Sequence, residues 1–215
     1  MKRSVLLCFA LLLLCGCQPK EAAAFDPQSA VEPAQNWIES LELENGSLFA
    51  ADLDLSGEPE LYLLWGDGEY DNQIVGMDCS DGSLVTGLPM GKPADENWWV
   101  ALCYNEDFAY VSIDTKVFAC SADGESNPSH IQHNISMKKG VLSDFTVFVN
   151  QGADGSSSYV IDGKIITDPH EYDQAMKDYL LQDAEGGSID CYSYEGDPSE
   201  AILAALNGWN EEFGK

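Results

Sequence analysis

Short apolar and aromatic runs, cut at regular intervals by turn signals, fill the chain from Gly46 to about Gln151. The turn segments are DGEYDN, CSDGSL, YNEDF, SADGESNPS and MKKGV, and the Asp81-Gly82 pair is the clearest hairpin signal among them. Runs this short, interrupted this often, predict strands joined by hairpins. The successive strands are expected in WWVALCY, FAYVSID, KVFACSA, IQHNISM, DFTVFVN and SSYVIDGKII. The sequence therefore predicts an antiparallel β-meander over residues 46 to 166.

The apolar period becomes helical at both ends of this region. Pro33 is typical of a helix start and predicts a helix over residues 33–43. Asp168 as N-cap and Pro169 in the first turn predict another over residues 168–182, and a further Asp-Pro pair precedes a third at 198–212. IDCYSY is a candidate extra strand. Helices grouped at the N- and C-terminal ends of an antiparallel sheet describe an α+β fold, with residues 33–215 as a single domain.

One turn is unusual in its chemistry. Between the apolar runs LFAA and LYLLW, the segment DLDLSGEPE places oxygen-bearing side chains at alternating positions, with Gly57 among them. The segment matches the D-x-D-x-[DNS]-G-x-x-[DE] pattern and resembles the calcium loops of FG-GAP and dockerin proteins. That resemblance implies side-chain ligands from Asp52, Asp54, Ser56 and Glu60, and a backbone carbonyl ligand from Glu58.

The same segment resembles DxDGDGxPEL, a signature of uncharacterised surface lipoproteins of gut Firmicutes. A second segment, YVIDGKIITDPHEYDQAMKDYL, is similar to the YxVNGKxVSxEEYxxALxxYL ending of those proteins. The resemblance covers most of the chain, although only these two motifs are specific. It implies a surface lipoprotein built on a β-meander, without catalytic residues to transfer.

The candidate loop departs from the pattern in two places. Ser56 stands where a third carboxylate is usual, and Leu55 stands where a Gly is usual, so both the charge and the bend are weaker. Leu63 occupies the twelfth position, which excludes an EF-hand closed by a bidentate Glu. Two interpretations stay open: a weak Ca²⁺ site, with a dissociation constant on the order of 10⁻⁴ to 10⁻³ M, and a metal-free acidic hairpin.

The N-terminus carries export signals. Lys2 and Arg3 precede the apolar run SVLLCFALLLLCGC, which has the length of a signal-peptide core and is short for a membrane span. Its end, LCGC, resembles the bacterial lipobox, which implies cleavage after residues 1–16 and a lipid on Cys17. Residues 17–32 then form a polar, Ala- and Pro-rich tether. The expected location is the cell membrane, lipid-anchored and facing outside the cytoplasm; an ordinary secretory signal with an incidental Cys is the alternative.

Charge excludes one class of partner. The formal net charge is −27, and cleavage after Gly16 removes Lys2 and Arg3 but no acid, which makes it −29. A surface this acidic repels phosphate backbones, so the sequence predicts no nucleic-acid partner. With 45% hydrophobic residues the chain still has enough apolar material for a packed core.

Four cysteines remain after Cys17, namely Cys79, Cys103, Cys120 and Cys191. In an exported domain they allow two disulfides with three connectivities. They also fit free, buried thiols that act as small hydrophobes. No pair has the CxxC spacing of a zinc or redox site.

Other constellations are weaker. His130 and His133 are three residues apart in a predicted strand, which sends them to opposite faces and disfavours a zinc pair. The sequence contains no GxSxG elbow and no P-loop or dinucleotide glycine pattern. Adjacent Trp98 and Trp99 place one ring in the core and one outward, where it is a candidate contact for a glycan or an envelope protein.

Three function classes follow. The first is a non-enzymatic binding or structural lipoprotein of the envelope with one weak Ca²⁺ loop. The second is a hydrolase of a wall or dietary polymer that uses paired carboxylates about 5 to 10 Å apart. The third is a subunit that docks on another envelope protein. The sequence favours the first class because it offers no catalytic constellation.

Overall fold

The computed structural model describes residues 25–66, 72–90, 92–93, 100–120, 126–151, 156–161, 164–179 and 185–213. The predicted α+β class is confirmed: in these ranges, strands predominate and helices lie near both ends of the chain. The helices are α2 (Pro27–Ser40), α3 (Pro169–Tyr179) and α4 (Ser199–Glu212). The strands are β1 (Asn45–Ala51), β2 (Glu60–Trp65), β3 (Asn72–Asp78), β4 (Leu84–Met90), β5 (Lys92–Pro93), β6 (Val100–Tyr104), β7 (Ala109–Cys120), β8 (Ser126–Lys138), β9 (Val141–Gln151), β10 (Ser157–Ile161), β11 (Lys164–Ile166), β12 (Glu185–Ile189) and β13 (Tyr192–Glu195).

The first helix begins earlier than predicted. Asp26 caps α2 by accepting a hydrogen bond from the Gln28 amide, and Pro27 occupies the first turn, while Pro33 lies inside the helix. The segment before Pro33 therefore belongs to the fold, since Ala30 and Val31 are buried there. Two Pro residues in one polar stretch look like a tether in sequence, but Pro27 is tolerated at the helix start.

The other helix predictions hold more closely. The Asp168 carboxylate accepts a 2.8 Å hydrogen bond from the His170 amide and begins α3 as expected. The predicted end of α3 at residue 182 lies outside the described residues. The last helix, α4, begins one residue after the predicted start and ends at Glu212 as predicted.

The hairpins follow the turn signals with three differences. Asp81-Gly82 turns between β3 and β4, with Gly82 at a positive φ of 74°. The segments FAYVSID and KVFACSA, predicted as two strands, form the single strand β7. IDCYSY, predicted as one strand, is split between the end of β12 and β13. SSYVIDGKII, predicted as one strand, forms the two paired strands β10 and β11.

The described strands form one connected sheet, in which the order along the main path is β12-β6-β7-β8-β9-β4-β3-β2-β1-β13. All paired strands are antiparallel except β4 and β9, which meet at a single parallel pair, Thr86 and Val141. The two ends of this path, β12 and β13, are joined in the chain by only Asp190 and Cys191. The sheet therefore curls until its ends approach each other.

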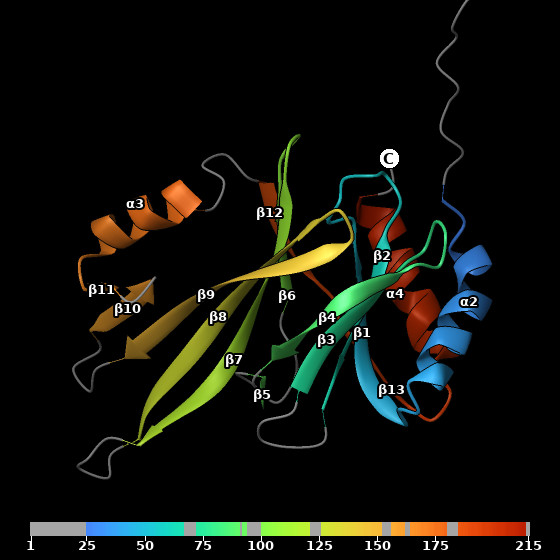
Figure 1. The fold of residues 1–215 in the computed structure, drawn as a ribbon, viewed down its shortest axis with the longest axis horizontal. Helices are drawn as coiled ribbons and strands as arrows, with labels where there is room; N and C mark the ends of the chain where they lie inside the picture. Colours follow the sequence, from blue (N-terminus) through green and yellow to red (C-terminus); the bar gives the residue numbers. More distant parts are fainter. Residues whose placement is uncertain are drawn as a thin grey trace, which may run out of the picture.

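Three apolar clusters hold these elements together. Helices α2 and α4 cover one face of β1, β2 and β13 (Figure 1), and Trp37, Ile202 and Leu206 are buried there. The opposite face of β1 and β2 packs against β6 to β9 across a second cluster that contains Phe49 and Tyr62. Because β1 and β2 are buried on both faces, their sequences are continuous apolar runs.

The third cluster lies apart from the other two. Helix α3 covers β9, β10 and β11 at the far end of the long strands (Figure 1). Tyr159 of β10 stacks on Tyr172 of α3, with ring centroids 3.7 Å apart. The long strands β7 to β9 thus connect two separately packed ends of the domain.

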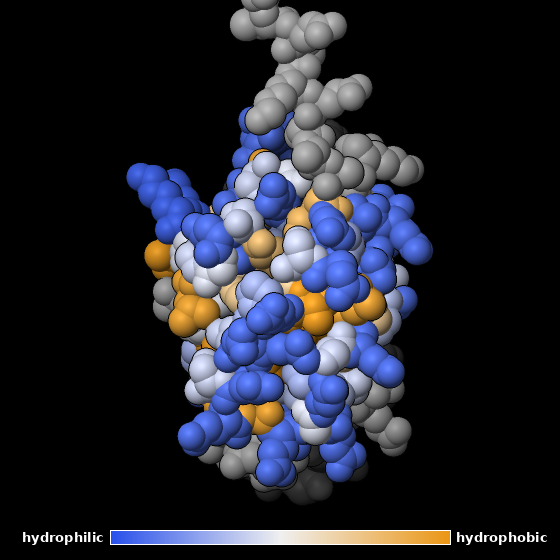
Figure 2. Space-filling model, turned by 90° about the vertical axis from the view of Figure 1, so that its right-hand side faces the viewer, coloured by the Kyte–Doolittle hydropathy of each residue, from blue (hydrophilic) through white to orange (hydrophobic). Residues whose placement is uncertain are grey.

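Cys79, Cys103 and Cys191 are free thiols, so no disulfide joins any two of them. The side chain of Cys120 lies outside the described residues. No helix in the described ranges is long and apolar enough to cross a membrane. Figure 2, which views the side where α2 and α4 lie, shows a mostly hydrophilic surface with small hydrophobic spots.

Candidate metal site

The segment DLDLSGEPE forms the hairpin loop between β1 and β2. Ala51, the last residue of β1, pairs with Glu60, the first residue of β2, and this pair closes the loop. Leu53 is only 2% exposed and anchors the loop in the cluster shared with Phe49 and Tyr62. Residues on both sides of the loop mouth are therefore fixed by the core rather than by solvent-exposed turns.

The loop brings three of the predicted ligands together. One carboxylate oxygen from each of Asp52, Asp54 and Glu60 lies within 4.8 Å of the other two. Asp54 is exposed, Asp52 is half-buried, and Glu60 is only 1% exposed. The group is therefore open to solvent on the Asp54 side and ends at the buried Glu60 carboxylate on the other.

Backbone amides of the loop donate hydrogen bonds to two of these carboxylates, Asp52 and Asp54. Asp52 accepts hydrogen bonds from the amides of Ser56 (2.9 Å) and Gly57 (2.8 Å), one on each oxygen. The Ser56 amide is shared with Asp54 Oδ1 at 2.9 Å. The Ser56 hydroxyl donates to the Glu58 carbonyl at 3.0 Å, so these two predicted ligands contact each other in this structure. Each of these oxygens keeps a further lone pair for a cation.

The bend of the loop uses two left-handed residues. Gly57 has a φ of 90°, which Gly adopts at low cost, and Leu55 has a φ of 59°, which is unfavourable for a residue with a side chain. The pattern expects Gly at the Leu55 position, so the loop keeps the Gly conformation without the Gly. The side chain of Leu55 is 38% exposed and receives little compensation from packing.

Glu60 is the electrostatic centre of the site. Its Oε2 atom accepts hydrogen bonds from the Leu53 amide (2.8 Å) and the Tyr62 hydroxyl (3.1 Å). Its Oε1 atom is buried and has no hydrogen-bond partner among the described residues. The pKa of Glu60 is raised from 4.5 to about 8, chiefly by burial; the nearby charges of Asp54 and Asp52 act in the same direction, and the two hydrogen bonds oppose the shift.

The same environment acts on the neighbouring groups. Burial, together with the charge of Asp54, raises the pKa of Asp52, although its two amide hydrogen bonds oppose the shift. Burial raises the pKa of Tyr62 well above its ordinary value, and the adjacent Glu60 adds to that shift. When all three are ionised, the carboxylates in this space repel one another.

These residues fit a hard divalent cation. Ca²⁺ takes six to eight oxygen ligands at about 2.3 to 2.6 Å, and carboxylates are its preferred charged ligands. A cation between Asp52, Asp54 and Glu60 would give the orphaned Glu60 Oε1 a partner and offset the repulsion among the three. Ser56 Oγ and the Glu58 carbonyl lie on the same loop and are the available neutral donors.

Three other predicted positions lie outside the described residues: the lipidation site Cys17 and the candidate contact residues Trp98 and Trp99. His130 and His133 both lie on β8, as predicted. His133 is buried, and its partners are on the neighbouring strands rather than at His130.

Sequence reasoning missed a polar row across β7, β8 and β9. His133 Nδ1 lies 2.6 Å from Asp144 Oδ2, and His133 Nε2 lies 3.2 Å from Thr115 Oγ1. This order of acid, imidazole and hydroxyl resembles a nucleophile-activating triad, but Thr115 is fully buried and no substrate could reach its hydroxyl. The row is a structural hydrogen-bond network. Only the strand register could have revealed it, because Thr115, His133 and Asp144 are far apart in sequence.

Comparison of the chain with protein-family models, with curated proteins and with solved structures finds no match. The resemblance to gut lipoproteins consequently rests on the two sequence motifs alone.

Proposed function

We propose that residues 52–60 form a Ca²⁺-binding loop in a non-enzymatic, lipid-anchored envelope protein. The observation that carries the metal proposal is Glu60 Oε1: it is buried, it has no hydrogen-bond partner among the described residues, and it belongs to a carboxylate that lies with Asp52 and Asp54 inside 4.8 Å. A buried carboxylate without a full set of partners is costly, and a cation offsets that cost.

The loop position suggests a structural role for the ion. Glu60 pairs with Ala51 where the β1–β2 hairpin closes, and its side chain accepts a hydrogen bond from the Leu53 amide. Leu53 is buried in the central cluster. An ion held by Glu60 from the core side and by Asp52 and Asp54 from the loop side would fix the hairpin tip. Such an ion stabilises the fold by mass action, because the unfolded chain presents no preformed site.

The alternative function, a hydrolase that uses paired carboxylates, is supported less well. The one group of three carboxylates that converges in the described residues is Asp52, Asp54 and Glu60, and its spacing suits metal ligands. A glycosidase requires an acid and a base or nucleophile on opposite sides of a substrate, about 5 to 10 Å apart.

Thermal unfolding tests the metal proposal. Millimolar Ca²⁺ should raise the melting temperature of the parent protein, with a gain of about 1 kcal/mol when free Ca²⁺ is a few-fold above the dissociation constant. Mg²⁺ should do less, because it requires a tighter octahedron. The variant Asp52→Asn with Asp54→Asn should lose the Ca²⁺ shift.

Screening of the large negative charge needs its own control. The pair Glu106→Gln with Asp107→Asn removes the same charge from the exposed turn between β6 and β7. This control should keep the parent's Ca²⁺ shift at fixed ionic strength. Equal Ca²⁺ shifts in the parent and in the Asp52/Asp54 variant would show that the segment is only an acidic hairpin.

The anchor is supported by the lipobox-like LCGC and by the polar stretch that follows it. The partner implied is the membrane itself, through a lipid on Cys17, and an envelope protein or a glycan is the candidate for the exposed domain. Cys17→Ser should leave the chain unprocessed or release it from membranes on fractionation. Normal processing and unchanged membrane association of that variant would contradict the anchor.

A further inference from the structure

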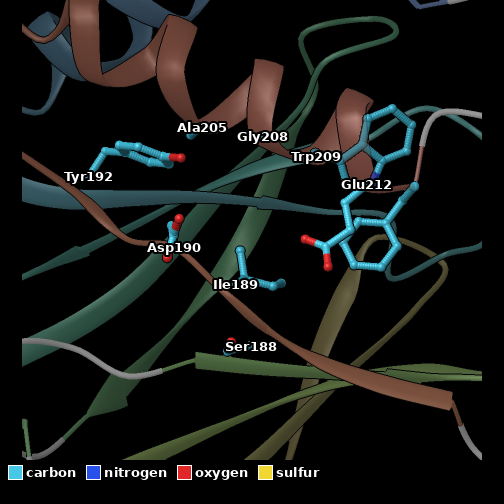
Figure 3. A pocket seen from close by; sticks show the side chains of 9 residues that line it. Ser188, Ile189, Asp190, Tyr192, Ala205, Gly208, Trp209 and Glu212 are labelled. Carbon is cyan, nitrogen blue, oxygen red and sulfur yellow. The ribbon is translucent and has the colours of Figure 1, made fainter.

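A cavity of about 260 Å³ lies at the corner where the curled sheet ends meet, between the β12–β13 connection and the last turns of α4 (Figure 3). Ile189 and Asp190 line it from the strand connection, and Trp209 and Glu212 line it from the helix. No part of the candidate metal loop contributes to it. The volume corresponds to about nine waters, since one water occupies roughly 30 Å³.

Two aromatic residues that line this cavity, Trp209 and Phe213, are fixed by neighbours outside it. Trp209 is 5% exposed and packs edge-to-face against Phe25, with ring centroids 5.8 Å apart. Phe213 packs in the same manner against Tyr104, also at 5.8 Å. The aromatic walls are therefore preorganised and need not rearrange to accept a ligand.

A glycine in the helix lies close to an aromatic residue that lines the cavity. A Cβ atom on Gly208 would lie 3.2 Å from the Tyr192 hydroxyl oxygen, closer than ordinary van der Waals contact. In Figure 3 the Tyr192 side chain extends beneath α4 in the direction of Gly208. Gly is a poor helix former, and here its small size leaves room for the Tyr192 ring beside the cavity.

Three features make the surroundings of the cavity negative: the carboxylates of Asp190 and Glu212, and the C-terminus of α4. Figure 3 shows the carboxylates of Asp190 and Glu212 on either side of Ile189. Glu212 reaches toward β12, since its Oε1 atom would lie 3.7 Å from a Cβ on Gly187. Glu212 also lies in the last turn of α4, where the helix dipole is negative and acidic residues are disfavoured.

No basic residue nearby in sequence balances these charges. Residues 185–213 contain seven acids and no Lys, Arg or His. Two carboxylates, aromatic rings and a helix C-terminus around one cavity all favour a cation, because cations are attracted to carboxylates, to the faces of aromatic rings and to the negative end of a helix.

We propose that this cavity binds the ammonium group of a primary alkylamine, with the aliphatic chain against Trp209 and Phe213 and the charge between Asp190 and Glu212. The aromatic rings among the lining residues favour an organic cation over a bare metal ion, which requires converging oxygens. In the described residues the only carboxylate triad close enough for a metal is the one at Asp52, Asp54 and Glu60. The proposal does not depend on the calcium loop.

NMR titration with n-butylammonium tests the proposal. Saturable shifts are expected for the Trp209 indole N–H and for the amides of residues 188–192 and 208–213, assigned with the help of Trp209→Phe. n-Butanol has the same chain without the charge and should bind at least about fivefold more weakly, since one ionic contact in a water-exposed setting is worth about that factor. Equal shifts with both probes would overturn the proposal.

Three variants localise the binding. Glu212→Gln should weaken n-butylammonium about fivefold or more. Glu200→Gln, which removes an exposed charge from the first turn of the same helix, should change the affinity less than twofold. Gly208→Ala should weaken n-butylammonium binding while preserving the helix, because the added methyl must displace the Tyr192 hydroxyl, which lines the cavity, by a few tenths of an ångström. An equal loss in Glu200→Gln and Glu212→Gln would mean that only the general negative field attracts the amine.

Two sources of the ammonium group are separated by a second probe. Nα-acetyl-lysine methylamide carries the same butylammonium on a peptide unit, so tighter binding of this probe identifies a lysine side chain of a protein as the ligand. Equal or tighter binding of n-butylammonium identifies a free amine. Lys215 follows Phe213 by two residues, so each titration is repeated in Lys215→Gln. Absence of saturable shifts in both backgrounds would refute the site.

Discussion

The Tyr62 hydroxyl donates a 3.1 Å hydrogen bond to Glu60 Oε2, and both residues are buried on the same face of β2. Tyr62 is itself fixed by stacking on Phe49, with ring centroids 5.1 Å apart. The core thus holds one oxygen of Glu60 through a rigid partner and leaves the other, Oε1, for the loop. This relationship fixes the position of Glu60 as a ligand in the proposed site.

Tyr62→Phe should destabilise the protein by about 1 kcal/mol in the presence of a chelator and by about 1.5 to 3 kcal/mol in saturating Ca²⁺. The larger loss is expected with the ion because Glu60 is then ionised, and hydrogen bonds to charged groups are stronger. Urea unfolding of the parent and the variant, once with the chelator and once with Ca²⁺, measures both losses of unfolding free energy. Tyr194→Phe is the matched control, because the Tyr194 hydroxyl is buried without a hydrogen-bond partner in the described residues, and its removal should cost nothing. A loss that is the same with chelator and with Ca²⁺ would contradict the ligand role of Glu60.

Leu55→Gly should stabilise the protein by about 0.5 to 1 kcal/mol. The left-handed conformation costs a non-Gly residue about 1 to 2 kcal/mol, and the greater flexibility of unfolded Gly returns part of that gain. Leu84→Gly is the control: Leu84 is an exposed residue of β4, and Gly should weaken the strand there. Chemical unfolding of both variants gives the signs, and destabilisation by Leu55→Gly would show that the Leu55 side chain contributes packing that its exposure does not suggest.

Cys79 and Cys191 should alkylate slowly. Burial raises the pKa of each thiol to about 12, so at pH 9 the reactive thiolate is about 500-fold rarer than for a thiol with a pKa of 9. Because the folded pKa exceeds the unfolded one, this contribution to stability is complete below pH 9 and is lost as the pH rises toward 12. Iodoacetamide labelling followed by mass spectrometry measures the rate, and the same protein in concentrated urea is the reference. Equal labelling rates in the folded and unfolded protein would contradict the burial of these thiols.

Asp144→Ala should cost about 2 kcal/mol or more of unfolding free energy. The substitution leaves His133 Nδ1 and the Thr146 hydroxyl without their shared acceptor in a largely buried setting. Asp107→Ala, in the exposed turn between β6 and β7, should change stability by less than about 0.5 kcal/mol. Urea midpoints compare the two, and similar small effects would show that water replaces the lost contacts of His133.

Much of the fold could be predicted from local sequence signals. Asp168 and Pro169 begin α3 as predicted because capping depends on neighbouring residues alone. Asp81-Gly82 turns where expected for the same reason. The predicted start of the first helix at Pro33 was wrong. Pro33 is a start signal in sequence, but Asp26 and Pro27 supply a better one upstream.

For the candidate site, the sequence determined the donors but not their environment. The spacing of Asp52, Asp54 and Glu60 is a local pattern, and a hairpin loop brings such residues together with little help from the rest of the chain. Only the tertiary structure decided that Glu60 is buried, because its burial comes from Tyr62, from Leu53 and from the strands packed over them.

The cavity beneath α4 and the row through His133 were decided by the tertiary structure alone. Tyr192 and Gly208 are distant in sequence, as are Thr115 and Asp144, and no local pattern marks either pair. Strand register and the closure of the sheet at Asp190 and Cys191 place them together. Capping, turns and ligand spacing are set over a few residues, whereas burial and register depend on how distant strands pair, which is a property of the whole chain.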